Sequence, residues 1–126
     1  MIIPALRYDD AQAAINFLER AFGFHRKEVH ENGDGNVLHA ELTSGRGMVM
    51  IGSAGQGDKQ FDTGRASLYV IVADPDAVHE RAKAAGAEIT REPQDMDYGS
   101  REFSARDPEG NVWSFGTYDP FDVTAA

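Results

Sequence analysis

The sequence contains no cysteine, so it can form neither a disulfide nor a thiolate zinc site, and it has no cysteine nucleophile. It also has no apolar run near the roughly 20 residues that a membrane-spanning helix needs. The N-terminal residues MIIPALRYDD lack the basic region and long apolar segment of a secretory signal. We therefore expect a cytoplasmic protein with no membrane partner.

Basic residues are also scarce: 12 Lys and Arg are outnumbered by 21 Asp and Glu, which gives a formal net charge of −9. The phosphates of nucleic acid and of anionic lipid repel such a chain, which would gain nothing from counterion release. We expect no nucleic-acid partner, and the charge favours a cationic or neutral ligand. With 126 residues, 41% of them hydrophobic, the chain is long enough to form one globular domain with a core.

Two segments show apolar residues at helical spacing between an aspartate cap and a glycine. The first begins after Asp9 or Asp10 and ends at Gly23, and the second begins at the cap Asp74, has Pro75 in its first turn and ends at Gly86. The apolar positions of the two segments are Ala11, Ala14, Ile15, Leu18, Ala21 and Phe22, and Ala77, Val78, Ala82 and Ala85. This spacing predicts a helix in each segment.

Strand-like segments surround both helices in the same order, one before each helix and three after it. They are residues 3–8, 24–30, 37–42 and 48–51, and residues 67–72, 87–92, 101–106 and 112–118. Gly23 and Gly86 are 63 residues apart, and so are the hairpin glycines Gly47 and Gly110. The pattern predicts a single α+β domain of two tandem βαβββ modules. Module one covers about 1–52, a linker about 53–65, module two about 66–119 and a C-terminal tail 120–126.

Three tracts carry a resemblance to a known family: ALRYDDAQAAINFLERAFGF, LHAELTSGRGMVMIG and YGSREFSARDPEGNVWSFGTY. On these tracts the chain resembles the vicinal-oxygen-chelate superfamily of glyoxalases and bleomycin resistance proteins. The third tract looks like its PhnB-like branch, which binds no metal. The resemblance implies the glyoxalase/bleomycin resistance fold, in which each module curls a mixed sheet into a cleft and helices cover the outer face. It also implies a homodimer, often with exchanged modules.

The enzymes of that superfamily hold a divalent metal with carboxylate and imidazole groups from the first and last strand of each module. The resemblance places these four positions at Ile3, at Ile51 or Met50, at Ala66 or Ser67, and at Ser114. Apart from a weak hydroxyl, none of these side chains is a competent metal ligand. We therefore expect no metal site and no cofactor, and interpret the dispersed His25, His30, His39 and His79 as surface or satisfied residues.

The alternation of side chains along strands separates core positions from cleft positions. In the turn DPEG, Pro108 and Gly110 suit a hairpin and need no catalytic reason, and the following Trp113 and Phe115 are expected in the core. Leu38, Ala40, Leu42, Leu68, Val70 and Val72 are expected on the helix side. The candidate ligand-binding residues are His39, Glu41, Met48, Met50, Ser67, Tyr69, Tyr98, Arg101, Phe103 and Ser114, with Ile71 on the same side and Asp95 and Asp97 near Tyr98.

These residues favour a small-molecule-binding protein that sequesters a planar or cationic ligand, such as an antibiotic, without metal. The alternative is a lyase, isomerase or dioxygenase-like enzyme that uses Glu41 and His39, or a non-standard metal site, for general acid–base chemistry. An ion pair of Glu41 with Arg26 or Lys27 competes with that interpretation. Tyr98 and its acidic neighbours can equally be solvated loop residues. A third hypothesis is an interaction module with no ligand.

Overall fold

The computed structural model, described for residues 1–122, contains the βαβββ unit twice. The predicted tail therefore lies partly outside the described residues. Module one consists of β1 (Ala5–Tyr8), α1 (Ala11–Phe22), β2 (His25–Glu31), β3 (Val37–Ser44) and β4 (Gly47–Ser53). Module two consists of β5 (Ser67–Ile71), α2 (Pro75–Ala84), β6 (Glu88–Asp95), β7 (Arg101–Arg106) and β8 (Val112–Gly116). A 3₁₀ turn, η1 (Lys59–Phe61), lies between the modules and was not predicted.

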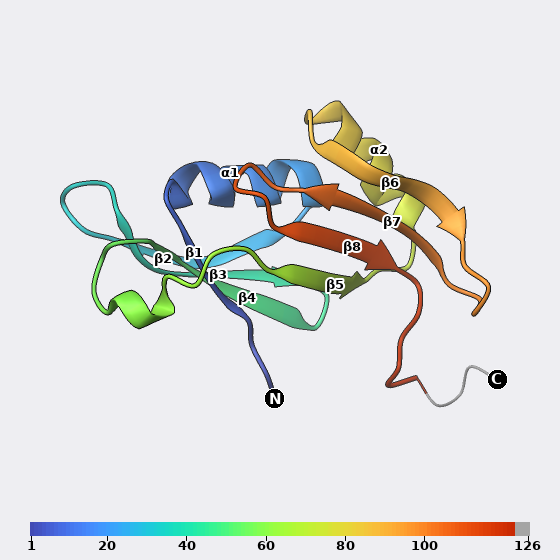
Figure 1. Ribbon diagram of the computed structural model, residues 1–126, viewed down its shortest axis with the longest axis horizontal. Helices are drawn as coiled ribbons and strands as arrows, with labels where there is room; N and C mark the ends of the chain where they lie inside the picture. Colours follow the sequence, from blue (N-terminus) through green and yellow to red (C-terminus); the bar gives the residue numbers. More distant parts are fainter. Residues whose placement is uncertain (123–126) are drawn as a thin grey trace.

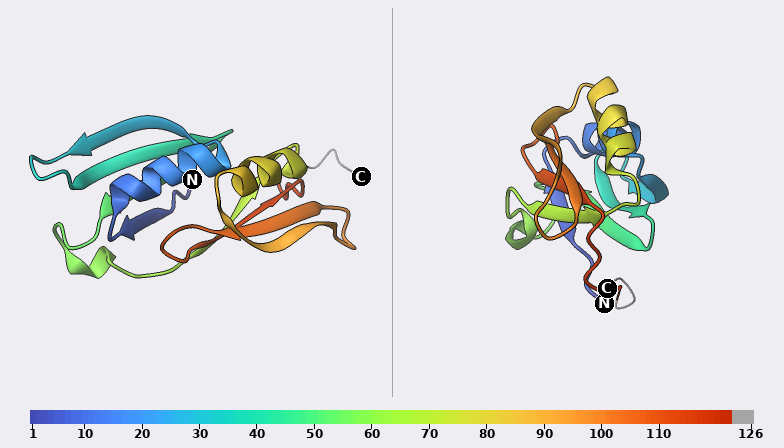
Figure 2. Two further views of the ribbon diagram at one scale, coloured as in Figure 1. Left: turned by 90° about the horizontal axis from the view of Figure 1, so that it is seen from above. Right: turned by 90° about the vertical axis from the view of Figure 1, so that its right-hand side faces the viewer.

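Each module forms its own four-stranded mixed sheet with the same topology. The strand orders are β1-β4-β3-β2 and β5-β8-β7-β6, and the first strand of each module runs parallel to the last. Both helices lie on the same side of the molecule, above the two sheets (Figure 1). Figure 2 shows the modules side by side along the long axis, with α1 and α2 adjacent. The predicted α+β class and duplicated architecture are confirmed. No helix within residues 1–122 is long and apolar enough to cross a membrane.

The N-terminal caps of both helices are those that the sequence predicts, whereas α2 ends with Ala85 as its C-terminal cap, one residue before the predicted Gly86. The Asp10 carboxylate accepts a hydrogen bond from the Ala13 amide at 3.0 Å, and the Asp74 carboxylate does the same for Ala77 at 3.1 Å. Gly23 ends α1 with a φ of 73°, in the left-handed region that favours glycine. On α2, however, Ala77 is exposed instead of lying on the apolar face. The buried positions are Pro75, His79 and Ala82, and the His79 ring packs edge-on against Phe103 at 5.3 Å.

One hydrophobic core joins the two modules. Phe22 and Phe24, at the end of α1, pack against Trp113 and Phe115 of β8, with ring centroids 4.8 Å apart for Phe22 and Phe115 and 5.4 Å apart for Phe24 and Trp113. Trp113 and Phe115 are thus core residues, as the alternation predicts. Aromatic pairs of this kind contribute about 0.5–1.5 kcal/mol each beyond their buried area. The packing fixes the second sheet against the first helix.

The turn DPEG is a second structural link between the modules. The Asp107 side chain is buried and accepts hydrogen bonds from Tyr8 Oη at 2.6 Å, Trp113 Nε1 at 3.0 Å and Asn111 Nδ2 at 3.0 Å. Its other carboxylate oxygen accepts hydrogen bonds from the backbone amides of Glu109 and Asn111. The Glu109 carboxylate in turn accepts hydrogen bonds from the backbone amides of Asp9 and Asp10, which precede α1, at 2.7 and 2.9 Å. Because every acceptor is used by the scaffold, the turn is structural.

Candidate functional site

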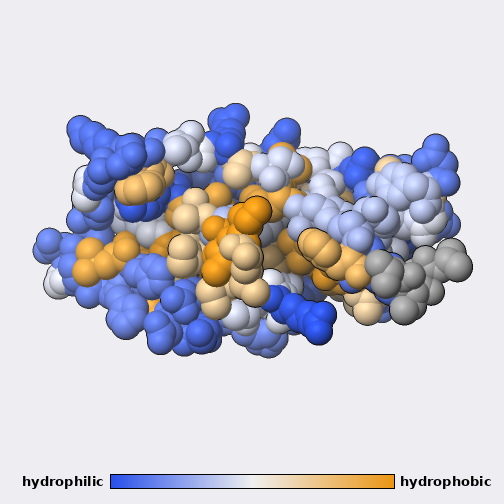
Figure 3. Space-filling view, turned by 90° about the horizontal axis from the view of Figure 1, so that it is seen from below, coloured by the Kyte–Doolittle hydropathy of each residue, from blue (hydrophilic) through white to orange (hydrophobic). Residues whose placement is uncertain are grey.

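The faces of the two sheets that point away from the helices are open, and they carry apolar side chains. Figure 3, which views the molecule from the side opposite the helices, shows orange patches among the charged surface. Besides Met1, Ile2 and Ile3 before β1 and Phe121 after β8, the exposed large apolar and aromatic residues within residues 1–122 are Leu38, Phe61, Tyr69, Ile71, Tyr98 and Tyr118. Exposed apolar groups that gather on one face mark a surface that can bind another molecule.

On module one, the predicted His39, Glu41, Met48 and Met50 do lie together. All four are half-buried, and Glu41 pairs with Met50 across β3 and β4. His39 Nε2 lies 2.8 Å from Glu41 Oε2, and Lys27 Nζ lies 3.5 Å from Glu41 Oε1. Arg26 instead binds Glu19. The hydrogen bond from His39, together with the charge of Lys27, lowers the pKa of Glu41. A carboxylate with a lowered pKa is a weaker general base, so this geometry disfavours the acid–base role.

A pocket of about 290 Å³ adjoins these residues on the open face of module one. Leu38, His39, Met50 and Phe61 are among its lining residues, and the Arg7 guanidinium lies 5.6 Å from the centre of the Phe61 ring. The prediction that Leu38 faces the helices is wrong, because its side chain is 57% exposed. The pairing of β2 with β3 shifts between His30 and Glu31, and this bulge turns Leu38 outward while Val37 enters the core.

On module two, Ser67, Tyr69 and Ser114 lie on the open face, as predicted. Tyr69 pairs with Ser114 across β5 and β8, and the Ser114 hydroxyl lies 2.8 Å from that of Ser104. The Tyr69 hydroxyl donates to the backbone oxygen of Tyr118 at 2.8 Å. Its ring reaches over Gly116, where an added Cβ would lie 2.5 Å from Tyr69 Oη. The absence of a side chain at Gly116 therefore allows this position of Tyr69.

Glu102 is a further candidate site residue, which the sequence does not indicate. Its side chain lies on the open face beneath Tyr69, is only 4% exposed, and accepts a hydrogen bond from Tyr98 Oη at 2.8 Å. This hydrogen bond is the main reason why the pKa of Tyr98 is raised. Arg91 Nη2 approaches the other carboxylate oxygen at 3.4 Å. Tyr98 also packs edge-on against Tyr118, with ring centroids 6.0 Å apart.

Two predicted ligand contacts, Phe103 and Arg101, lie on the helix side of the sheet instead. Phe103 is fully buried and stacks on Phe115 at 5.1 Å. Arg101 donates to both carboxylate oxygens of Asp76 on α2, at 2.7 and 3.0 Å, and to Asp95 at 3.1 Å. Both errors have one cause: β7 pairs with β8 so that Phe103 lies opposite Phe115, and a one-residue change of register reverses every side chain.

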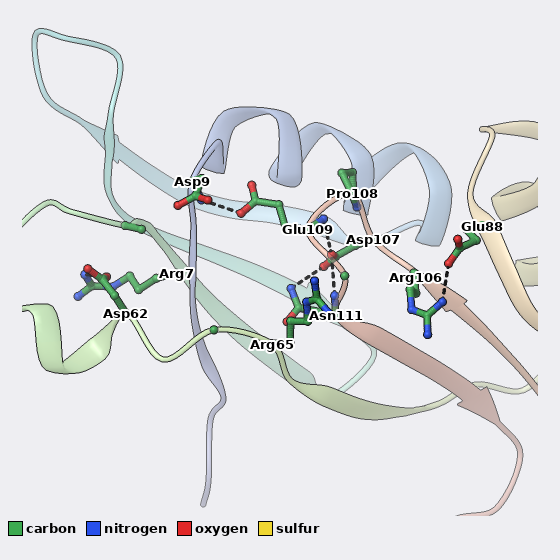
Figure 4. Close-up of a pocket in the computed structure, with 13 residues that line it drawn as sticks. Arg7, Asp9, Asp62, Arg65, Glu88, Arg106, Asp107, Pro108, Glu109 and Asn111 are labelled. Carbon is green, nitrogen blue, oxygen red and sulfur yellow. Dashed lines mark hydrogen bonds and ion pairs between the residues drawn. The ribbon is translucent and has the colours of Figure 1, made fainter.

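A larger pocket, of about 650 Å³, lies at the junction of the modules (Figure 4). Its charged lining is largely engaged in the scaffold. Arg7 pairs with Asp62 at 3.5 Å, Arg106 pairs with Glu88 at 2.9 Å, and Asp107 and Glu109 make the turn contacts described above. We therefore place the candidate site on the open faces and not in this pocket.

The donor set of the open faces does not fit a divalent metal. Residues 1–122 hold no group of three or more His, Cys, Asp or Glu side chains placed to bind one. At the positions where the resemblance places ligands, Met50 and Ser67 lie on the open side, whereas Ile51 is buried. The Ser114 hydroxyl already contacts Ser104.

Comparison with known proteins matches residues 3–115 to the model of the Glyoxalase/Bleomycin resistance protein/Dioxygenase superfamily. An uncharacterized protein of Mycobacterium bovis is 30% identical over an alignment of 121 positions, which covers 90% of this chain and 80% of that protein. The crystal structure of TioX from Micromonospora sp. ML1 is similar with a TM-score of 0.79 and 33% identity, over 91% of this chain and 95% of that one.

A lactoylglutathione lyase from Agrobacterium tumefaciens is a more distant structural neighbour. Its TM-score is 0.69 at 22% identity, over 92% of both chains. At this identity the likeness concerns the fold alone.

Proposed function

This chain belongs to the Glyoxalase/Bleomycin resistance protein/Dioxygenase superfamily, and we propose that it binds a planar or cationic small molecule on its open sheet faces without metal. One observation carries the proposal: Tyr69, Tyr98 and Tyr118 lie exposed on the open side of module two. Flat aromatic rings stack on flat ligands, and their faces attract cations. The net charge of −9 adds a general attraction for a cation.

The proposed mode of action is sequestration, in which the protein holds a ligand such as an antibiotic and does not alter it. Met48, Met50 and the exposed Leu38 offer adaptable apolar surface for its uncharged part. A homodimer in the cytoplasm is part of the proposal, because a second copy placed over an open face would shield a bound ligand from water.

The enzymatic alternative has one supporting contact, the 2.8 Å approach of His39 to Glu41. Its weakness is that Glu41 has a lowered pKa and a second partner in Lys27. If the protein were a lyase, isomerase or dioxygenase-like enzyme that uses this pair, Glu41→Gln would abolish turnover. A binding function predicts no turnover for Glu41→Gln to abolish.

Thermal unfolding with a ligand panel tests the proposed function. The panel contains bleomycin, N-methylquinolinium, and the ions Ni²⁺, Zn²⁺ and Mn²⁺. A ligand at about 100 times its dissociation constant adds about 2.7 kcal/mol to the free energy of unfolding, which raises Tm by several degrees. We expect stabilisation by an organic cation and none by the metals. Stabilisation by a metal alone would refute the proposal.

A further inference from the structure

The open face of module two combines three exposed aromatic rings with one buried carboxylate. Tyr98 Oη donates a hydrogen bond to Glu102 at 2.8 Å. Tyr69 and Glu102 meet over Gly116, because a Cβ added at Gly116 would lie 2.5 Å from Tyr69 Oη and 2.7 Å from Glu102 Cγ. The Tyr118 ring packs against that of Tyr98, and the backbone oxygen of Tyr118 accepts a hydrogen bond from the Tyr69 hydroxyl. We call Tyr69, Tyr98, Tyr118 and Glu102 the tyrosine cluster.

The buried Glu102 carboxylate has fewer hydrogen-bond and ion-pair partners than a buried carboxylate requires. An ionised carboxylate offers about four acceptor positions, and burial is costly where these are not used. Among the described residues it has two polar contacts, with the neutral hydroxyl of Tyr98 and with the Arg91 guanidinium at 3.4 Å. That distance is longer than the roughly 2.7–2.9 Å of a charge-assisted hydrogen bond. The carboxylate can therefore gain from a closer cation.

Arg91 is a weak competitor for this position. Its side chain is 41% exposed, and its Nε is buried without a hydrogen-bond partner among the described residues. A guanidinium held by one long contact and with one unsatisfied donor loses little if it turns toward solvent. The Tyr69 ring, in contrast, is held in place by its hydrogen bond to the backbone oxygen of Tyr118, and the Tyr98 ring packs edge-on against that of Tyr118.

From this geometry we infer that the tyrosine cluster is the subsite for the positively charged group of the ligand, with Glu102 as its counter-ion and the tyrosine rings as its walls. The ligand class is an organic cation, a quaternary or protonated nitrogen attached to a flat apolar body. The inference rests on the proposed function and narrows it, because a planar but uncharged ligand would not use Glu102. Tyr98 closes the site in the absence of ligand, and its hydroxyl gives up the Glu102 oxygen when the cation binds.

Isothermal titration calorimetry with two matched probes tests the inference. N-methylquinolinium carries a permanent charge, and quinoline, kept neutral in mildly alkaline buffer, has nearly the same shape. We expect the wild-type protein to bind the cation at least about tenfold more tightly, because the Glu102 carboxylate attracts the permanent charge at short range and offers no such attraction to the neutral probe. Glu102→Gln should remove most of that preference and leave quinoline binding unchanged. The control Glu31→Gln makes the same charge change at an exposed site outside the cluster and should keep the preference.

A second variant does not depend on the buried position. Tyr98 is 56% exposed, so Tyr98→Leu should fold, and it should weaken binding of the cation about fivefold by removing one aromatic wall. Tyr98→Phe, which retains the ring and frees the Glu102 oxygen, should bind the cation at least as tightly as the wild type. If Glu102→Gln fails to fold by circular dichroism, the two Tyr98 variants decide the question.

The outcomes separate the two proposals. Equal binding of both probes, unaffected by Glu102→Gln, would overturn the cation subsite and leave the binding function standing. Failure of both probes and of bleomycin to bind the wild-type protein would overturn the proposed function, and the subsite with it.

Discussion

Replacing Tyr8 by phenylalanine removes one hydroxyl from the polar network that joins the two modules. The Tyr8 hydroxyl, on β1 of module one, donates to the buried Asp107 of module two at 2.6 Å. A hydrogen bond to a charged group contributes about 1.5–3 kcal/mol, and the variant leaves a carboxylate oxygen of Asp107 with fewer donors in a buried site. The substitution retains the ring, so the packing of Tyr8 in the core stays nearly the same. We expect Tyr8→Phe to lower the free energy of unfolding by about 2 kcal/mol.

Thermal and urea unfolding followed by circular dichroism measure this loss. For a domain of this length, about 2 kcal/mol corresponds to a fall in Tm of roughly 5–12 °C. Tyr118→Phe is the matched control, because Tyr118 is half-exposed and the substitution removes the same atom. A loss below about 0.5 kcal/mol for Tyr8→Phe would refute the idea that this hydrogen bond holds the modules together.

The same variant has a predicted pH dependence. Burial, together with the hydrogen bond to Asp107, raises the pKa of Tyr8 far above its ordinary value of 10.0. A group with a raised pKa contributes its full stability below the unfolded pKa, and this contribution is lost as the pH rises above that value. The difference in stability between wild type and Tyr8→Phe should therefore be constant at neutral pH and shrink above about pH 10. A constant difference across that range would contradict the assignment.

Three further substitutions test other parts of the structure. Gly116→Ala should displace Tyr69 and Glu102, lower the free energy of unfolding by about 1–3 kcal/mol and weaken cation binding. Unfolding and titration experiments measure both effects, and Gly33→Ala is the control because an added Cβ there meets nothing within 4 Å. Glu109→Gln should cost about 1 kcal/mol by weakening the cap on the Asp9 and Asp10 amides, and faster amide hydrogen exchange at the start of α1 would report it. Arg81→Met should loosen the other end of α1, because Arg81 donates to the backbone oxygens of Glu19 and Arg20; unchanged exchange there would contradict this role.

Most of the fold could be predicted from local sequence signals. The caps Asp10 and Asp74, the terminating Gly23 and the repeated strand order are each determined within a few residues, and the structure confirms them. The alternation along β5 and β8 also placed Tyr69, Trp113 and Phe115 correctly, because these strands pair without a bulge.

The errors arise where strand pairing decides which way a side chain points. Arg101 and Phe103 were placed on the open face because the register of β7 against β8 depends on contacts distant in sequence. The alternation of β3 failed at Leu38 because of the bulge opposite it. The same uncertainty of register hides Glu102: it is the neighbour of Phe103 on β7, so the register that turns Phe103 into the core turns Glu102 to the open face. A buried glutamate next to a core phenylalanine has no local sequence signal.

The duplicated architecture explains where specificity can reside. In module one, Glu41 pairs with Met50 on the open face and Ala40 with Ile51 in the core; in module two, Ser104 pairs with Ser114 on the open face and Phe103 with Phe115 in the core. The core pairs are apolar in both modules because they support the helices.

The pairs on the open face have no such constraint, and their chemistry differs completely between the modules. The scaffold itself is held by contacts at both ends of α1, from Glu109 at its start and from Arg81 at its end. These contacts, with the shared aromatic core, fix the two sheets relative to each other without using any residue of the open faces. The residues of the open faces can therefore change with the ligand while the fold is retained, which is why the tyrosine cluster, and not the turn DPEG, is where the ligand preference of this chain should be measured.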